Sequence, residues 1–279
     1  MNVYVARQAI FDTNKQIIAY ELLFRNSNIN KFTPIEGLNP TLNVIKNSFS
    51  IIGLDKITEG KRAFINFDEA LLKSGIIETI HKDCIVVEIL ETINPDDTII
   101  NCCKHLKTKG YIIALDDFEY DYKFDKLMRY IDIIKVDFTL TKGKGRKEIM
   151  YRIRNKNIKF LAEKVETEKD YEEALEYGYS YFQGYFFCKP VIISGNDIFI
   201  YKPTYIKLIK ELSSEVVDIE NVENLIKSDV ALSYKVLKII NSAYYSFSKE
   251  ITSIRNAIMI IGINELKRWV FIMELKSIT

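Results

Sequence analysis

Short apolar runs alternate with stretches of helical periodicity from Val3 to Phe187, and this alternation restricts the fold more than any other feature. The runs expected to form strands are Val3–Phe11, Ile17–Phe24, Ala63–Phe67, Ile85–Leu90, Ile112–Leu115, Ile131–Val136, Phe160–Ala162 and Tyr179–Phe187. The stretches expected to form helices are Thr41–Ile52, Thr98–Thr108, Asp125–Tyr130, Arg146–Asn155 and Lys169–Tyr177. Such alternation is typical of a parallel α/β fold. Only the polar turn Asp12–Lys15 separates the first two runs, which predicts an opening hairpin.

Polar residues stand where these runs end. They are Glu21, Asn66, Glu88, Asp116, Asp117, Lys135, Asp137, Glu163 and Gln183. In a TIM-like barrel the C-terminal strand ends converge on one face, and that face carries the active site. An open doubly wound sheet would not bring all these ends together, and the chain has no G-x-G-x-x-G turn to support one. We therefore predict a TIM-like (β/α)8 barrel whose first strand runs antiparallel to the rest.

The pattern changes at about Tyr201, beyond which the chain is helical without strand alternation. Ser228-Asp229 is placed to cap a helix through Ala231–Ile240, and Ser253 to cap one through Ile261. We predict two domains, a barrel over residues 1–200 and an all-α segment over residues 201–279. The segment is too short to bury much surface by itself, so it packs on the barrel or belongs to a larger domain.

Charge and cysteine content narrow the class of protein. The 39 lysines and arginines and 38 acids leave a net charge of +1, which argues against nucleic-acid or membrane binding driven by a basic field. The four cysteines form no C-x-x-C pair, and no apolar run approaches the roughly 20 residues of a membrane span. These features predict a soluble, cytoplasmic protein with thiols packed in its core.

The strand-end residues point to a metal-dependent chemistry. One charged residue at a strand end is most often a solvated rim or a helix cap, but a whole ring of carboxylates on one barrel face would repel unless cations neutralise it. Carboxylate and amide oxygens suit Mg²⁺ or Mn²⁺. A zinc site is disfavoured because the only histidines, His81 and His105, are not at strand ends. The residues alone therefore favour metal-assisted hydrolysis of a phosphate ester, with the substrate open.

The same strand ends carry motifs in a recognisable order. They are Ala6–Ile10 (ARQAI), Tyr20–Arg25 (YELLFR), Ile65–Phe67 (INF), Val87–Thr92 (VEILET), Ala114–Phe118 (ALDDF), Ile134–Asp137 (IKVD), Ala162–Thr167 (AEKVET) and Gln183–Pro190 (QGYFFCKP). This series resembles the motifs of EAL phosphodiesterases over about residues 1–200. The resemblance implies an enzyme that hydrolyses cyclic di-GMP to linear pGpG in bacterial signalling, and it implies a homodimer.

Carried over position by position, the resemblance implies two divalent cations, Mg²⁺ or Mn²⁺. The implied ligands of the first cation are Glu21, Asn66, Glu88 and Asp116. Asp117 would hold the second, with Asp116 as a bridge. The implied catalytic residues are Lys135, which would orient the nucleophilic water, Glu163, a ligand or base, and Gln183, which would hold the water network. Substrate contacts are implied for Gln8 and Arg25, and supporting roles for Glu91, Asp137 and Glu166.

The chain departs from the family pattern at three places. Glu119–Lys123 replaces a glycine-rich loop after the two aspartates, Lys164 replaces a glycine, and Ala9 replaces a proline. The loop is expected to position the second cation and adjoin a dimer interface near Asp117–Leu127. Its aromatic residues, Tyr120, Tyr122 and Phe124, either anchor that interface or pack on the barrel wall.

The tail resembles HDOD output domains through Ile226–Ser242 and Ile251–Val270. A complete HDOD module would be longer, and the tail has no histidine, so it is not expected to be a metal hydrolase of the HD type. Its helices either bind a protein partner or pack within the chain. Three functions remain open: an active phosphodiesterase, a cyclic di-GMP receptor that has lost turnover through its altered loop, and a scaffold that presents the tail.

Overall fold

The computed structural model describes residues 2–25, 39–153, 157–197, 200–242, 245 and 250–274. Contacts within the chain divide it into two compact units. The barrel unit comprises residues 7–22 and 61–191, and the helical unit comprises residues 1–6, 23–60 and 192–279. Within the described ranges, none of the helices has the length and apolar character needed to cross a membrane. The predicted division at residue 200 stays a prediction.

Eight strands close into a barrel. They are β1 (Asn2–Asp12), β2 (Ile17–Arg25), β3 (Arg62–Phe67), β4 (Ile85–Ile89), β5 (Ile112–Leu115), β6 (Ile133–Asp137), β7 (Lys159–Glu163) and β8 (Tyr181–Phe182). Neighbours from β2 to β8 pair in parallel, β8 pairs antiparallel with β1, and β1 returns to β2. A ninth strand, β9 (Val191–Asn196), pairs with β1 outside the closed ring. The predicted barrel with an antiparallel first strand is confirmed.

The opening hairpin is held by its polar turn. The Asp12 carboxylate accepts hydrogen bonds from the backbone N–H groups of Asn14 and Gln16, each at 2.8 Å. Lys15 takes the left-handed conformation that closes the turn, with φ of 57°. A turn this short forces β1 to run against β2, so the local chemistry of Asp12–Lys15 sets the direction of the one antiparallel strand of the barrel.

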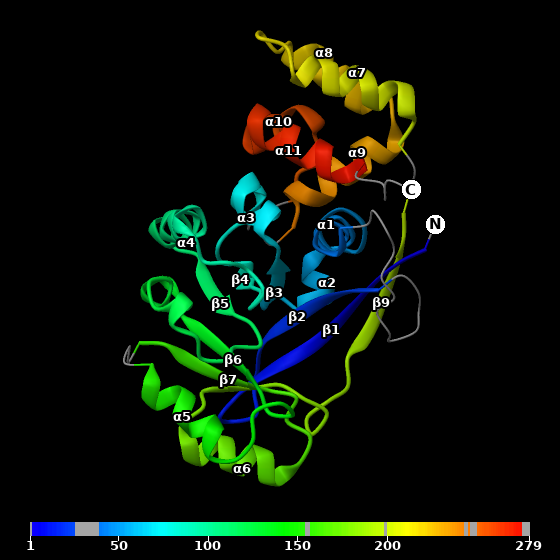
Figure 1. Ribbon diagram of the computed structural model, residues 1–279. Coiled ribbons are helices and arrows are strands. Elements are labelled where there is room, and N and C mark those ends of the chain that lie inside the picture. Colours follow the sequence, from blue (N-terminus) through cyan, green and yellow to red (C-terminus); the bar gives the residue numbers. More distant parts are fainter. Residues whose placement is uncertain are drawn as a thin grey trace. The chain divides into compact units, whose positions relative to one another are not determined.

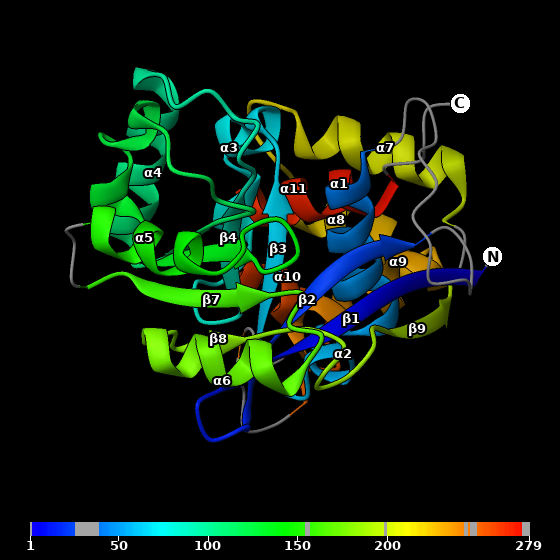
Figure 2. The same ribbon diagram turned by 60° about the horizontal axis from the view of Figure 1, so that its bottom comes forward.

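Helices cover the outside of the barrel strands, as Figure 1 shows for α4, α5 and α6. The helices of this unit are α3 (Glu69–Ser74), η2 (Ile76–Thr79), α4 (Asp97–Lys109), α5 (Lys144–Arg152) and α6 (Glu168–Tyr177). Asp96 caps α4, and a capping box between Thr167 and Asp170 begins α6. Helix α6 packs on the end of β8 (Figure 2), where the rings of Tyr171 and Phe182 meet edge to face at 4.9 Å.

The helix predicted over Asp125–Tyr130 is absent from the described chain, and this prediction is wrong. Two 3₁₀ turns, η3 (Tyr122–Phe124) and η4 (Met128–Tyr130), join β5 to β6 instead. The buried apolar residues Phe124 and Leu127 are three apart, which matches the three residues per turn of a 3₁₀ helix. The backbone bonds follow the same period, since Leu127 N donates to Phe124 O and Tyr130 N to Leu127 O.

The helices of the helical unit come from two separate parts of the sequence. The first part holds α1 (Pro40–Ile45), the π-helical η1 (Lys46–Ile52) and α2 (Leu54–Thr58). The second holds α7 (Lys202–Leu212), α8 (Ile219–Lys227), α9 (Val230–Ile240), α10 (Ile254–Ile261) and α11 (Ile263–Glu274). Asp229 and Ser253 cap α9 and α10 as predicted. The two parts join in one core, where the rings of Phe49 and Trp269 lie 5.6 Å apart.

Candidate metal centre

The interior of the barrel begins with an apolar layer. Each of the first seven strands contributes one residue, namely Ile10, Ala19, Phe64, Val86, Ala114, Ile133 and Leu161, and Tyr181 of β8 packs against them. Side chains alternate along a strand, so residues two positions apart share a face. On each strand, the residue two positions from this layer toward the C-terminal strand ends must therefore also face the interior of the barrel.

That next residue is polar on every strand. In order of strands it is Gln8, Glu21, Asn66, Glu88, Asp116, Lys135, Glu163 and Gln183. Gln8 comes two residues before Ile10 rather than after it, because β1 runs antiparallel. Register agrees with the spacing, since Asn66 pairs directly with Glu88 across β3 and β4. Eight predicted site residues thus lie in one layer at the mouth of the barrel.

Lys135 lies at the centre of this layer with its side chain fully buried. Its Nζ lies 2.6 Å from Glu88 Oε1 and 2.6 Å from Asp116 Oδ1. It lies 2.8 Å from Glu163 Oε1 and 3.6 Å from Glu21 Oε1. The approaches to Glu88 and Asp116 lack hydrogen-bond geometry, so they are close ion pairs rather than aligned bonds. One ammonium group therefore faces four carboxylates.

Two amide side chains orient Glu21 from either side. Gln183 Nε2 donates to Glu21 Oε2 at 2.6 Å, and Asn66 Nδ2 donates to Glu21 Oε1 at 3.5 Å. The residue after Gln183 is a glycine because the chain passes against β7 there. A Cβ on Gly184 would lie 2.1 Å from the carbonyl oxygen of Val165. Gly184 thus lets Gln183 approach close enough to hold Glu21.

Burial and mutual repulsion shift the protonation of this cluster. Burial raises the pKa of Glu88 well above its usual value, and repulsion from Glu21 and Asp116 adds to the rise, although Lys135 opposes it. Burial and Asp116 raise the pKa of Glu163 in the same way. Burial alone would lower the pKa of Lys135, but the attraction of the four carboxylates outweighs it and raises that pKa well above 10.5.

Asp117 and Asp137 flank the central group. Asp117 follows Asp116 with a left-handed φ of 38°. Single oxygens of Asp116, Asp117 and Glu163 lie within 4.8 Å of one another, close enough to share a cation. Asp137 pairs in register with Glu163 and accepts hydrogen bonds at 2.6 Å from both the backbone N–H and the hydroxyl of Thr139. The assigned ligand and catalytic roles stay predictions, while the proximity of the residues is observed.

The remaining predicted residues lie outside the strand-end layer. Glu91 lies in the turn after β4, and Glu166 is exposed in the loop after β7. Arg25 ends β2 in the helical unit, where its guanidinium donates to the carbonyl of Phe24 at 2.7 Å. Its predicted contact with a substrate phosphate stays a prediction, as do the supporting roles of Glu91 and Glu166.

In the sequence, Lys164 stands out only as a departure from the family pattern. In the structure Lys164 Nζ forms a close ion pair with Asp137 and lies 3.8 Å from Asp117 Oδ1. The signal that could have found it was its place directly after Glu163, where a side chain at the strand end reaches the neighbouring aspartates.

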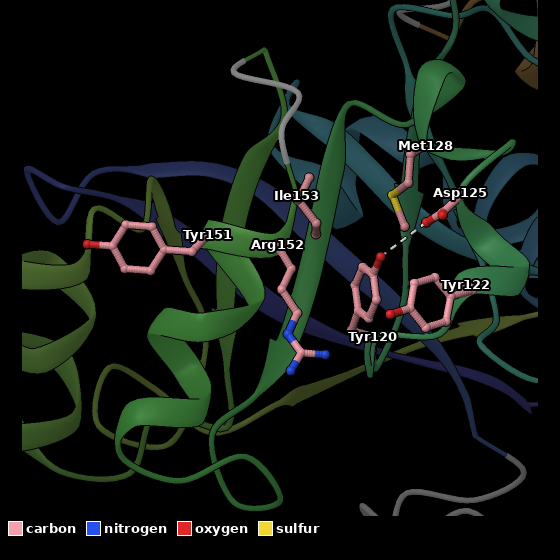
Figure 3. A pocket seen from close by; sticks show the side chains of 7 residues that line it. All are labelled: Tyr120, Tyr122, Asp125, Met128, Tyr151, Arg152 and Ile153. Carbon is pink, nitrogen blue, oxygen red and sulfur yellow. Dashed lines mark hydrogen bonds between the residues drawn. The ribbon is translucent and has the colours of Figure 1, made fainter.

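The three aromatic residues of the altered loop after Asp117 differ in burial. Phe124 is buried on the barrel, whereas the side chain of Tyr122 is 76% exposed. The Tyr120 ring meets the Tyr122 ring edge on at 5.4 Å, and its hydroxyl donates to Asp125 at 3.4 Å. Tyr120, Tyr122 and Asp125 line a cavity of about 680 Å³. The rest of its lining comes from Met128, Tyr151, Arg152 and Ile153 (Figure 3). Phe124 therefore packs on the barrel wall, which is one of the two roles expected for these aromatic residues. The predicted dimer contact of Tyr120 and Tyr122 stays a prediction.

The donors of the strand-end layer fit hard divalent cations. Within the part of the chain that the structure describes, Glu88 Oε2 and Gln183 Oε1 are buried oxygens without a hydrogen-bond partner, and Asp117 Oδ1 is a third. All the candidate ligands are carboxylate or amide oxygens, the set that Mg²⁺ and Mn²⁺ prefer. Four carboxylates around the one buried ammonium of Lys135 leave an excess of negative charge that cations would neutralise.

Comparison with known proteins identifies the family. The family model of the EAL domain matches residues 2–190. The chain belongs to the EAL family. The HDOD domain model matches residues 201–279, so the EAL–HDOD resemblance found in the sequence is confirmed.

Curated relatives extend over nearly the whole chain. The uncharacterized protein YuxH of Bacillus subtilis is 43% identical over 100% of this chain and 69% of its own length. The cyclic di-GMP phosphodiesterase CdgJ of Vibrio cholerae is 34% identical over 96% of this chain and 62% of its own length. The chain therefore spans about two thirds of the length of these two relatives.

Solved EAL structures share the barrel fold. An EAL domain protein of Listeria monocytogenes superposes with a TM-score of 0.54 at 22% identity, covering 68% of this chain and 88% of that one. A manganese and cyclic di-GMP complex of BlrP1 from Klebsiella pneumoniae gives a TM-score of 0.53 at 21% identity, covering 70% and 60%. At this identity the likeness establishes the fold alone.

Proposed function

We propose that this EAL protein is a metal-dependent phosphodiesterase that hydrolyses cyclic di-GMP to linear pGpG. The observation that carries the proposal is the strand-end layer, in which four carboxylates surround the buried ammonium of Lys135. Support comes from CdgJ, a relative named as a cyclic di-GMP phosphodiesterase. Further support comes from BlrP1, whose structure is a complex with manganese and this nucleotide.

The residues proposed to hold cations lie in the strand-end layer or directly after it. Glu21, Asn66, Glu88 and Asp116 would bind a first Mg²⁺ or Mn²⁺, and Asp117 would bind a second together with Asp116. Bound there, such cations would polarise the phosphodiester and neutralise charge that develops on its oxygens.

Three residues are proposed to act on the reacting water. Lys135 donates from its ammonium and stays protonated because the surrounding carboxylates raise its pKa. Glu163 lies 2.8 Å from Lys135, and burial raises its pKa, which makes it a stronger base than an exposed glutamate. Gln183 fixes Glu21 and keeps a buried carbonyl oxygen directed at the layer.

A receptor that binds cyclic di-GMP without turnover is the second candidate. The observation in its favour is the replaced loop after Asp117, which here forms the 3₁₀ turn η3 beside the implied second-cation ligand. A bare scaffold is the weakest reading, because burying so many charges costs free energy that a structural barrel could avoid with apolar residues. A homodimer, a protein partner of the helical tail and a cytoplasmic location remain further proposals.

Turnover separates the first two candidates. Purified full-length chain is mixed with cyclic di-GMP and Mg²⁺ or Mn²⁺, and linear product is followed by chromatography. We expect product in the metal-loaded sample and none in EDTA. Glu21→Ala should abolish turnover, whereas Glu69→Ala, which removes an exposed pair with Lys73, serves as the matched control. Tight nucleotide binding without product would favour the receptor.

A further inference from the structure

Lys164 takes a backbone conformation that lysine rarely adopts. It directly follows Glu163, and its φ is 53°. Asp117, which its ammonium approaches, also has a positive φ, and these are two of four such non-glycine residues in the described part of the chain. Residues other than glycine disfavour this region because their Cβ lies too close to a neighbouring carbonyl oxygen. Two strained residues facing each other at a candidate site point to a function for their contact.

Contacts of the next residue, Val165, fix the backbone at Lys164. Val165 N donates to Gln183 O at 3.0 Å, and Phe186 N donates to Val165 O at 3.0 Å. Val165 is fully buried and packs against Gly184 with no room for a Cβ. The chain leaving β7 therefore cannot relax to a negative φ without breaking these contacts, and the Lys164 side chain is directed along the mouth of the barrel.

The ammonium of Lys164 reaches two carboxylates. Asp137 is 3% exposed, and one of its oxygens is already used by Thr139 and Leu140. Its other oxygen, Oδ2, forms the close ion pair with Lys164. The second carboxylate is Asp117, whose Oδ1 lies 3.8 Å from the same ammonium. Lys164 thus places a fixed positive charge beside the residue proposed to bind the second cation.

We propose that Lys164 supplies this positive charge in place of the second divalent cation, so that the chain binds one cation tightly and a second only weakly. The inference rests on the proposed metal site. A divalent cation on Asp117 would lie within a few ångströms of an ammonium group, and like charges at that distance repel even though the Lys164 side chain is half exposed. The charge of Lys164 acts on the second site, because its ion-pair partners are Asp117 and Asp137, whereas Glu21 and Glu88 pair with Lys135.

Counting bound Mn²⁺ tests the proposal without reference to turnover. The full chain, stripped of metal, is titrated with Mn²⁺ and the free ion is measured by its paramagnetic resonance signal. Lys164→Gly removes the charge and suits a positive φ, and Lys164→Asn removes the charge while tolerating the same backbone. We expect one tight ion per wild-type chain, and a second ion that both variants bind at least about tenfold more tightly.

Lys164→Arg, which keeps the charge, should behave as the wild type. Lys15→Gly is the matched control, because Lys15 is an exposed lysine with φ of 57° in the hairpin turn, and its replacement should leave both affinities unchanged. Coupled pairs of Mn²⁺ ions should give their own resonance spectrum in both Lys164→Gly and Lys164→Asn. Equal affinities in wild type and both uncharged variants, or the same gain in Lys15→Gly, would overturn the inference and leave the proposed function standing. No bound Mn²⁺ in any of these proteins would overturn both.

Discussion

Replacing Lys135 by methionine removes the buried ammonium that faces four carboxylates while keeping an unbranched side chain of similar length. In the wild type four carboxylate oxygens lie between 2.6 and 3.6 Å from Lys135 Nζ. Without the ammonium, Glu88 and its neighbours face one another in a space that excludes solvent. Part of the charge would be lost by protonation, because burial already raises the pKa of Glu88.

The size of the effect follows from this burial. Removing one partner of a buried ion pair costs about 3–5 kcal/mol of unfolding free energy. For a protein of this size each kcal/mol lowers Tm by about 2–4 °C. Metal-free Lys135→Met should therefore unfold about 6–20 °C below the metal-free wild type. The pKa of Lys135 is raised on folding, so its contribution is fully present at neutral pH and is lost only as the pH rises above the ordinary lysine range.

Thermal unfolding followed by circular dichroism in EDTA measures this difference. Lys107→Met is the control, because the Lys107–Asp132 pair is also 2.6 Å long but about one third exposed, and its loss should cost about 1 kcal/mol or less. Adding Mn²⁺ should recover most of the loss in Lys135→Met, since a cation would replace the missing positive charge. A metal-free Lys135→Met as stable as Lys107→Met would refute the electrostatic account of the layer.

Three further predictions test other parts of the site. Burial raises the pKa of Glu88, and a ligand must be deprotonated to bind a cation. Mn²⁺ affinity should therefore begin to fall, with proton release on binding, at a pH above the ordinary titration range of glutamate. Calorimetry that finds a constant affinity down to that range would contradict this. Gly184→Ala should lose at least about 1–3 kcal/mol of stability by pushing Cβ into the Val165 backbone, and an unchanged denaturation midpoint would count against the packing described. Tyr120→Ser with Tyr122→Ser should weaken the predicted dimer and turnover together while sparing the first cation, and light scattering that finds an unchanged dimer would exclude this coupling.

The barrel and its polar layer could be predicted because both follow from a period of two. An apolar residue such as Phe64 or Val86 faces the interior, so Asn66 and Glu88 must face it as well. The hairpin at Asp12–Lys15 and the caps at Asp229 and Ser253 could also be predicted, because the side chain that makes each contact is close in sequence.

Features that depend on tertiary contact escaped prediction. The segment Asp125–Tyr130 has helical composition, but burial of Phe124 and Leu127 imposes a period of three. Nothing local indicates that η1 shares a core with the C-terminal helices, because Phe49 and Trp269 are far apart in sequence. The ion pair of Lys164 with Asp137 joins the ends of two strands, and only their register brings it about.

Calorimetric titration of cyclic di-GMP into the full chain tests most directly whether the strand-end layer is a metal-dependent nucleotide site. One sample is stripped with EDTA and the other holds Ca²⁺, a hard cation with the same oxygen preference. The account predicts that affinity rises when the divalent cation is present, and that Glu21→Ala loses the gain. Absence of cyclic di-GMP binding both with and without the cation would contradict the phosphodiesterase and receptor proposals alike.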